Sequence, residues 1–290
     1  MKTDTPRAGF AGLGAMGAPM ARNLAKAGLL AALYNRTAGT ATALAADLGC
    51  AAAPTPADLA AACDVVVLCV SADADVLQNV DALEDVLAPG SIVIDHSTVA
   101  RDTAIEAHRR LAARGIGFLD APVSGGVEGA RNGKLSVMVG GEGFVLERAR
   151  PVLEAYALRI THLGGPGSGQ ATKAVNQVLV AGIAQAVCEG LALGEKLGLA
   201  PDLLVPTLAA GAAGNWFLDK RGLTMLADNF TPGFKSGLLH KDLLIVREMA
   251  RAAGIRATVI EQSLADYGEL MAQGRGDEDT SALIRLKRGG

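Results

Sequence analysis

Three glycines near the start of the chain have the spacing of a dinucleotide-binding turn. Gly12, Gly14 and Gly17 form a G-x-G-x-x-G sequence between an apolar run and a segment of helical periodicity. In this arrangement the first glycine makes a tight turn, the second lets the backbone approach a pyrophosphate, and the third lets the helix pack closely on the strand. Because the chain contains 36 glycines, the spacing alone also fits an ordinary turn of a parallel α/β protein. The strand-turn-helix context favours a dinucleotide site.

The residues after the second predicted strand bear on which dinucleotide is bound. An enzyme that uses NAD usually has Asp or Glu there, whereas this chain has Asn35, Arg36 and Thr37. A guanidinium pairs well with two phosphate oxygens, so Arg36 could bind the 2′-phosphate of NADP, with its two neighbours as hydrogen-bonding groups. An exposed surface arginine is the alternative. The sequence favours NADP, with NAD as the second choice.

Three further segments follow apolar runs, where open α/β sheets bind ligands beyond the carboxyl ends of their strands. They are residues 70–72, 95–98 and 120–126. In the last of them Ser124 precedes Gly125 and Gly126, a sequence that can present a hydroxyl and backbone N–H groups to a carboxylate. A loop that only reverses the chain is the alternative.

A lysine and an asparagine stand out in a long apolar segment. Lys173 and Asn176 are three residues apart, so they share one face of a predicted helix. In isolation such a lysine more often reaches along the helix to solvent. Its place just after the predicted domain junction favours a pocket, because ligand sites are frequent at such junctions. Lys241 offers a second cation near the start of a later helix, where a solvated side chain is the alternative.

The elements that must position these residues begin with a region of alternating strands and helices. Up to residue 163, short apolar runs alternate with amphipathic segments, which predicts a parallel sheet covered by helices. Strands are expected at residues 8–13, 30–35, 50–53, 64–70, 91–95, 117–120, 136–139 and 160–163. Helices are expected at residues 15–27, 37–48, 55–62, 73–87, 102–114 and 143–155. Residues 1–163 are therefore predicted to form a Rossmann-type α/β dinucleotide-binding domain.

The remaining residues, 164–290, are predicted to form an all-α substrate and oligomerisation domain. A long apolar helix is expected over residues 170–197 and joins the two domains, and helical periodicity returns at 202–210, 238–253 and 257–273. The long helix is apolar on most sides, which often means that another subunit covers it.

Composition excludes several classes of function. The net charge of −3 and the lack of long runs of like charge argue against nucleic acid and acidic membrane surfaces as partners. The four cysteines form no C-x-x-C pair, and neither a secretory nor a membrane-spanning segment is expected, so the protein is predicted to be cytoplasmic with reduced thiols. The four histidines lack metal-ligand spacing, and no G-x-S-x-G, H-E-x-x-H or P-loop sequence occurs. No metal is expected.

Four motifs, in order, resemble those of the β-hydroxyacid dehydrogenases, the group of 3-hydroxyisobutyrate dehydrogenase, tartronate semialdehyde reductase and glyoxylate/succinic semialdehyde reductase. They are residues 12–24, 120–126, 167–176 and 241–243, so the resemblance covers nearly the whole chain. It implies hydride transfer between a nicotinamide cofactor and a small carboxylated hydroxy acid or semialdehyde. It also implies subunits that interlock through a helical second domain, as a homodimer or homotetramer. The sequence at Asn35 to Thr37 is similar to the NADPH-preferring branch.

The same resemblance assigns roles to individual residues. It implies that Lys173 is the catalytic acid or base and that Asn176, Ser124, Gly125 and Gly126 bind the substrate. The residues expected to bind the cofactor are Gly12, Leu13, Gly14, Ala15, Met16, Gly17, Asn35, Arg36, Thr37, Val70, Ser71, Thr98 and Lys241.

A few positions separate this chain from its relatives. Arg101 stands where the family often has proline. Val175 stands where 6-phosphogluconate dehydrogenases have a histidine, and Lys173 is a residue that imine reductases usually lack. Trp216 and Phe217 are expected either near the pocket or in the core. A non-catalytic NADP-binding sensor or assembly protein, or an enzyme like the imine reductases, is the alternative function.

Overall fold

The computed structural model describes residues 6–289, and the chain divides into two compact units, Met1–Lys173 and Ala174–Gly290. The division lies within one long helix. The boundary predicted from the sequence, between residues 163 and 164, lies a few turns earlier in the chain. The first five residues, where no secretory segment is expected, lie outside the described part.

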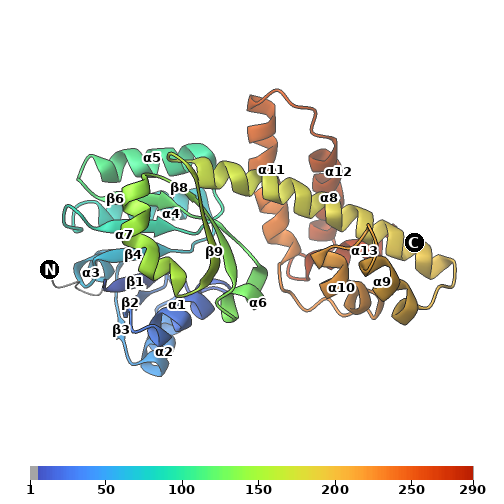
Figure 1. Ribbon diagram of the computed structural model, residues 1–290, viewed down its shortest axis with the longest axis horizontal. Helices are drawn as coiled ribbons and strands as arrows, with labels where there is room; N and C mark the ends of the chain where they lie inside the picture. The colour runs from blue at the N-terminus through green and yellow to red at the C-terminus, as the bar shows by residue number, and fades with distance from the viewer. Residues whose placement is uncertain (1–5, 290) are drawn as a thin grey trace. The chain divides into compact units, whose positions relative to one another are not determined.

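The first unit is built on one mixed β-sheet, drawn in Figure 1. The strands described between residues 6 and 173 are β1 (Ala8–Ala11), β2 (Leu30–Tyr34), β3 (Ala51–Ala52), β4 (Val65–Leu68), β5 (Ile92–Asp95), β6 (Gly117–Asp120), β7 (Val123–Ser124), β8 (Leu135–Gly140) and β9 (Ala157–Gly164). Their order across the sheet is β3-β2-β1-β4-β5-β6-β8-β7, with β9 paired to β8. The chain first builds outward from β1 to β3 and then returns to the other side of β1 with β4. This reversal is the topological switch point at which open α/β sheets bind ligands.

Helices cover both faces of the sheet because alternate strand residues point to opposite sides. Val65 and Val67 of β4 belong to one buried cluster with helices α1, α2 and α7, whereas Val66 and Leu68 belong to another with α3, α4 and α5. The helices of this unit are α1 (Gly17–Lys26), α2 (Ala38–Leu48), α3 (Pro56–Ala61), α4 (Asp73–Leu83), α5 (Arg101–Ala112), α6 (Gly126–Arg131) and α7 (Gly143–Glu154). The predicted Rossmann-type domain is confirmed.

The sheet departs from the prediction at its far edge. It was expected to be parallel throughout, but β8 runs antiparallel to both β6 and β7. The connection from β7 to β8 contains only the short helix α6, and a parallel return needs about a dozen residues or more. Strand β7 and helix α6 were not predicted, because the loop at residues 120–126 showed no periodicity long enough to reveal them.

The second unit is all-helical, as predicted. Beyond the end of the long helix α8 (Ser168–Lys196) it contains α9 (Pro201–Ala209), α10 (Trp216–Leu226), α11 (Ser236–Ala252), α12 (Thr258–Ala272), a 3₁₀ turn at Thr280–Leu283 and α13 (Ile284–Lys287). Ala181, Ala184 and Cys188 of α8 are fully buried in a cluster with apolar residues of α11 and α12. Helix α8 is long and apolar enough to span a membrane by length and composition alone, although no such segment was expected. One face of α8 packs into the buried cluster of the second unit, and 39% of its apolar window is buried.

Candidate functional site

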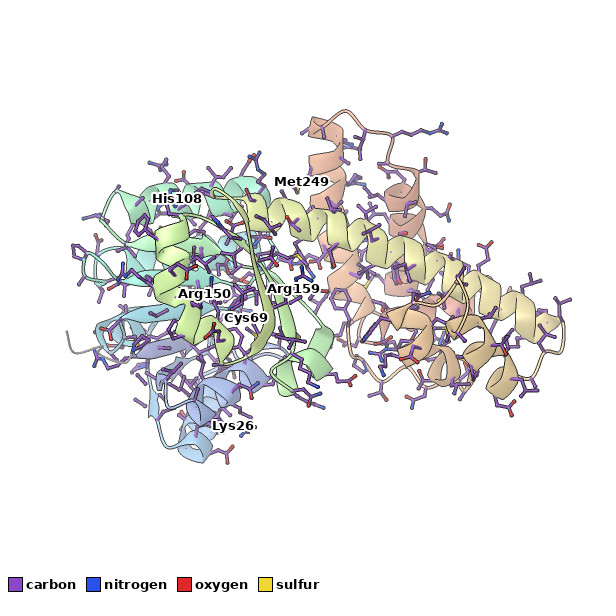
Figure 2. The ribbon with its side chains drawn as sticks, viewed as in Figure 1. Lys26, Cys69, His108, Arg150, Arg159 and Met249 are labelled. Atoms are coloured by element: carbon purple, nitrogen blue, oxygen red, sulfur yellow. The ribbon has the colours of Figure 1, made fainter. Side chains whose placement is uncertain are left out.

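The glycine turn has the geometry that its spacing predicted. Gly12 has a φ of +95°, and a Cβ added to it would overlap the carbonyl oxygen of Cys69, which directly follows β4 and is labelled in Figure 2. A Cβ on Gly17 would overlap the Gly12 carbonyl, whereas nothing lies within 4 Å of the Cβ position of Gly14. The first and third glycines are therefore required by packing. The second leaves open space where a ligand can approach the backbone.

The start of α1 is available to an anion. Its N-cap residue, Met16, makes no side-chain capping bond, and the first turn contains no acidic residue. The first N–H groups of a helix have no partner within the helix and lie at the positive end of its dipole. With the open approach at Gly14, these residues fit the pyrophosphate of a dinucleotide.

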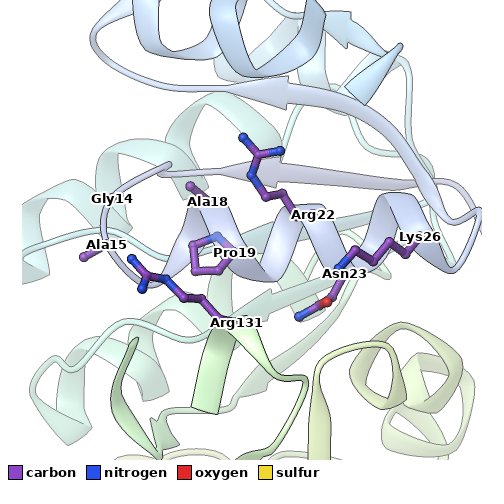
Figure 3. A pocket seen from close by; sticks show the side chains of 8 residues that line it. All are labelled: Gly14, Ala15, Ala18, Pro19, Arg22, Asn23, Lys26 and Arg131. Carbon is purple, nitrogen blue, oxygen red and sulfur yellow. The ribbon is translucent and has the colours of Figure 1, made fainter. Parts of the chain in front are cut away.

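A pocket of about 490 Å³ opens beside this turn, along the outer face of α1 (Figure 3). Its lining residues are Gly14, Ala15, Ala18, Pro19, Arg22, Asn23, Lys26 and Arg131. Three of these carry positive charge, although Arg22 is already paired with Asp47. The pocket therefore places Lys26 and Arg131 along the helix that follows the glycine turn, where they favour an anionic ligand.

Asn35 and Arg36, at the end of β2, have different surroundings. Oδ1 of Asn35 accepts a 2.9 Å hydrogen bond from the N–H of Leu13, so this side chain braces the glycine turn. Arg36 is 81% exposed, and its Nη1 lies 3.1 Å from Oδ1 of Asp75 near the start of α4. Thr37 is the N-cap residue of α2 and makes no side-chain capping bond. The guanidinium of Arg36 is thus accessible, with one carboxylate beside it.

The loops after β4 and β5 are joined by hydrogen bonds. The N–H of Val70 donates to Oγ of Ser97 at 2.9 Å, and the N–H of Ser97 donates to Oδ1 of Asp95 at 3.0 Å. Ser71 and Thr98, both expected to bind the cofactor, are the residues that directly follow Val70 and Ser97. The structure therefore fixes two of the predicted loops next to each other at the carboxyl edge of the sheet.

Lys173 is held against the third predicted loop. The side chain is only 8% exposed, and its Nζ donates a 2.9 Å hydrogen bond to the carbonyl oxygen of Val123. Ser124 follows at the end of β7, and Gly125 and Gly126 have φ values of +130° and +61°. These two φ values explain why glycines follow the serine. The ammonium of Lys173 and the Ser124 segment thus lie together within the first unit.

Burial changes the protonation of groups beneath this edge. It raises the pKa of Asp95 to about 7, although hydrogen bonds from Ser97 oppose the change. It also lowers the pKa of His96 to about 4, so this ring is neutral at pH 7. The His96 Nε2 lies 2.8 Å from the Tyr156 hydroxyl, and Nδ1 lies 2.5 Å from the Ala121 carbonyl oxygen. The buried imidazole is therefore in contact with the main chain of the 120–126 segment at Ala121.

In the second unit, Asn176 and Lys241 are linked through two buried side chains. Nδ2 of Asn176 donates to Oε1 of Gln177 at 2.8 Å, and Nε2 of Gln177 donates to Oδ2 of Asp242 at 2.7 Å. The other oxygen of Asp242 lies 3.0 Å from Nζ of Lys241. Gln177 was not singled out from the sequence, where its one signal was a polar type within an apolar helical pattern. Asp242 was noted only as part of the motif at residues 241–243.

Phe217, Trp216 and Arg101, which were also singled out from the sequence, have the following positions in the structure. Phe217 belongs to the buried core of the second unit, whereas Trp216 is 52% exposed with the Arg221 guanidinium 5.4 Å from its ring. Arg101 is the first residue of α5, and proline is also well accommodated at the first position of a helix. Between residues 6 and 289, no three His, Cys, Asp or Glu side chains are grouped as metal ligands.

Comparison with known proteins covers both units. Residues 7–164 match the family model described as the NAD binding domain of 6-phosphogluconate dehydrogenase. Residues 167–287 match the model described as NAD-binding of NADP-dependent 3-hydroxyisobutyrate dehydrogenase.

Individual relatives align over almost their whole length. The chain is 36% identical over 287 residues to the NAD-dependent L-serine dehydrogenase of Pseudomonas aeruginosa, with 96% of each chain covered. It is 34% identical over 280 residues to the 2-hydroxy-3-oxopropionate reductase of Escherichia coli, with 96% of this chain and 95% of the relative covered. Among solved structures, the 3-hydroxyisobutyrate dehydrogenase of Mycobacterium tuberculosis with L-serine gives a TM-score of 0.88 at 33% identity, covering 99% of this chain and all of the other.

Proposed function

Because the chain belongs to the β-hydroxyacid dehydrogenase family of nicotinamide-dependent oxidoreductases, we propose that it transfers a hydride between NADP(H) and a small carboxylated hydroxy acid or semialdehyde. The observation that carries the proposal is the hydrogen bond from Lys173 to Val123. It puts a buried ammonium beside the Ser124 segment, on the same sheet edge as the open glycine turn. An acid, an anion-binding loop and a cofactor turn on one edge are the parts that carbonyl reduction requires.

The residues of the chain would act as follows. The bound cofactor supplies the hydride. In the reductive direction the Lys173 ammonium donates a proton to the carbonyl oxygen of the substrate, which becomes the hydroxyl; in oxidation neutral Lys173 takes that proton back. The Ser124 hydroxyl and the N–H groups of Gly125 and Gly126 hold the substrate carboxylate. Asn176, one helical turn after Lys173, orients the substrate.

The preference for NADP rests on Arg36. Its exposed guanidinium stands directly after β2, where a ribose 2′-phosphate would be recognised, and Asn35 to Thr37 include no carboxylate that could accept a ribose 2′-hydroxyl. The Asp75 carboxylate beside Arg36 comes from α4 and is paired with the guanidinium. We assign the other cofactor contacts to the glycine turn, Val70, Ser71, Thr98 and Lys241, as expected from the resemblance.

We propose a cytoplasmic homodimer or homotetramer assembled through α8. Three large apolar side chains of this helix, spaced four residues apart, are exposed in the single chain and form a stripe. Its members are Val175, Leu179 and Ile183, with exposures of 61, 60 and 37%. Continuous apolar stripes on a helix are normally covered by another surface.

A substrate panel tests the function. The purified protein would be mixed with NADPH and glyoxylate or short semialdehydes, and with NAD or NADP and L-serine or 3-hydroxyisobutyrate, while nicotinamide absorbance is followed. We expect turnover with at least one carboxylated carbonyl compound, and faster turnover with NADPH than with NADH. Tight NADPH binding without turnover of any of them would instead support a non-catalytic NADP-binding protein. Turnover of cyclic imines alone would support the imine reductase-like alternative.

A further inference from the structure

A buried carboxylate on the sheet holds the first turn of α8. Asp120, the last residue of β6, is fully buried. Its Oδ1 accepts a 2.8 Å hydrogen bond from the N–H of Gly167, and its Oδ2 accepts a 2.9 Å bond from the N–H of Gln170. These N–H groups have no partner within the helix, and a negative charge is favoured at this end of it. Asp120 therefore caps α8 from a neighbouring strand.

Two glycines make this approach possible. A Cβ on Gly140 of β8 would overlap Oδ1 of Asp120, and a Cβ on Gly169 of α8 would overlap the main-chain oxygen of Asp120. Both positions have negative or extended φ values that any residue adopts, so conformation does not explain the glycines. The absence of side chains there lets the helix start lie within hydrogen-bonding distance of the carboxylate.

Gln170 ties the same turn to the loop after β5. This side chain is 1% exposed, its Nε2 donates to the Ser97 carbonyl oxygen at 2.7 Å, and its Oε1 accepts from the N–H of Val99 at 3.3 Å. Both atoms of the carboxamide are used, one on each side of Thr98. The start of α8 is thus attached to the end of β6 and to the loop after β5.

These anchors act on the helix turn that carries Lys173. Lys173 is three residues after Gln170, and its Nζ is bound to the carbonyl of Val123, three residues after Asp120. The segment 120–123 therefore holds both the main chain at the start of α8 and the ammonium at the end of the side chain. A shift of the helix start would move Nζ relative to Val123 and Ser124.

We propose that Asp120 and Gln170 are positioning residues that set the place of the Lys173 ammonium for proton transfer. The inference rests on the role of Lys173 in the proposed function, and it adds two buried residues whose side chains bond to main-chain groups and act through Lys173. Misplacing a reacting group by about 1 Å can cost about 100-fold in rate. A role in folding alone would lower stability and leave the rate per folded molecule unchanged.

A double-mutant cycle in the full-length protein separates the two roles. The rate constant kcat and the Kd for NADPH would be measured for the wild type, Asp120→Asn, Lys173→Ala and the double variant, with the best substrate of the panel. Asparagine keeps the shape of Asp120, but an Nδ2 in place of Oδ2 cannot accept a hydrogen bond from the N–H of Gln170. We expect Asp120→Asn to lower kcat about 10- to 100-fold with the NADPH Kd within about twofold of the wild type. In the Lys173→Ala background the same change should lower kcat less than about twofold.

The outcomes are distinct. Equal rate losses from Asp120→Asn in both backgrounds, or an unchanged kcat, would overturn the positioning role and leave the proposed function intact. A wild-type rate in Lys173→Ala would overturn the proposed acid and this inference with it. Gln170→Met keeps the length of the side chain and removes both of its hydrogen bonds, so the same cycle with this variant decides the question if Asp120→Asn does not fold.

Discussion

The Nζ atom of Lys173 and the carbonyl oxygen of Val123 are 2.9 Å apart, so a buried ammonium is fixed by the residue that precedes Ser124.

Lys173 should control the rate of the chemical step. Lys173→Met keeps the length of the side chain and removes its proton donor, and we expect kcat to fall about 10²- to 10⁴-fold. NADPH affinity should change less than about twofold, because the glycine turn is on other elements. Stopped-flow rates and a fluorescence titration with NADPH measure the two effects. A variant that keeps the wild-type rate would show that another group supplies the proton.

Ser124 should determine substrate affinity. Ser124→Ala removes a hydroxyl proposed to bind the substrate carboxylate, and a hydrogen bond to a charged group contributes about 1.5 to 3 kcal/mol. We expect kcat/KM to fall about 10- to 100-fold, mainly through KM. Ser136 is paired with Ser124 across β7 and β8, so Ser136→Ala is the matched control and should leave KM unchanged. Similar losses in both variants would indicate damage to the strand pair and not a lost substrate contact.

Arg36 and Asp75 should have opposite effects on cofactor choice. Arg36→Ala removes the proposed 2′-phosphate ligand, so the Kd for NADPH should rise about 10- to 100-fold while that for NADH stays nearly constant. Asp75→Asn removes the carboxylate beside the guanidinium, and we expect NADPH to bind tighter by less than about fivefold, because exposed ion pairs are weak. Titrations with both cofactors test this pair. Equal losses for NADPH and NADH in Arg36→Ala would exclude the 2′-phosphate contact.

The buried carboxyl of Asp95 should make stability depend on pH. Burial raises its native pKa from 3.8 to about 7, so between these values the unfolded chain has lost a proton that the native protein retains. Stability therefore falls as pH rises through this window. Asp95→Asn does not titrate but still offers an oxygen to the N–H of Ser97. Its stability relative to the wild type should rise by up to about 1.4 kcal/mol per pH unit between pH 4 and 7.

Urea unfolding of both proteins across this pH range measures the difference. Burial lowers the pKa of His96 to about 4, so its contribution to the free energy of unfolding falls as the pH is lowered. Because both proteins contain His96, this contribution cancels in the difference between them. A difference between the two free energies of unfolding that stays constant with pH would contradict the prediction.

The apolar stripe of α8 should hold the subunits together. Leu179 is 60% exposed in the single chain, and Leu179→Glu would put a charge into an apolar interface. We expect the variant to sediment as a smaller species than the wild type in analytical ultracentrifugation. Val86, which is 41% exposed in the loop after α4, provides the control Val86→Glu, for which the wild-type assembly is expected. An unchanged assembly in Leu179→Glu would place the interface elsewhere.

The local features of this protein could be predicted because they depend on neighbouring residues. Gly12, Gly14 and Gly17 lie within one strand-turn-helix, so their spacing and context were sufficient to predict the turn. The close approach of the Cys69 carbonyl to Gly12, after β4, is visible only in the fold. The alternation of apolar runs and amphipathic helices likewise predicted the Rossmann-type sheet and the helical second unit, and both are confirmed. The antiparallel direction of β8 was missed. It follows from the short connection between β7 and β8, which does not reach back to the opposite end of the sheet.

What the sequence alone determined is the set of chemical groups: a glycine turn between a strand and a helix, a lysine and an asparagine on one helix, and a serine followed by two glycines. Their individual roles stay predictions. Only the tertiary structure decided what holds them, since Asp120 and Gly167, or Gln170 and Ser97, are distant in sequence and meet by strand pairing and helix docking. Long-range hydrogen bonds of this kind leave no periodic signal along a chain. The candidate catalytic lysine could therefore be predicted from the sequence, and the bonds that fix its position are seen only in the fold.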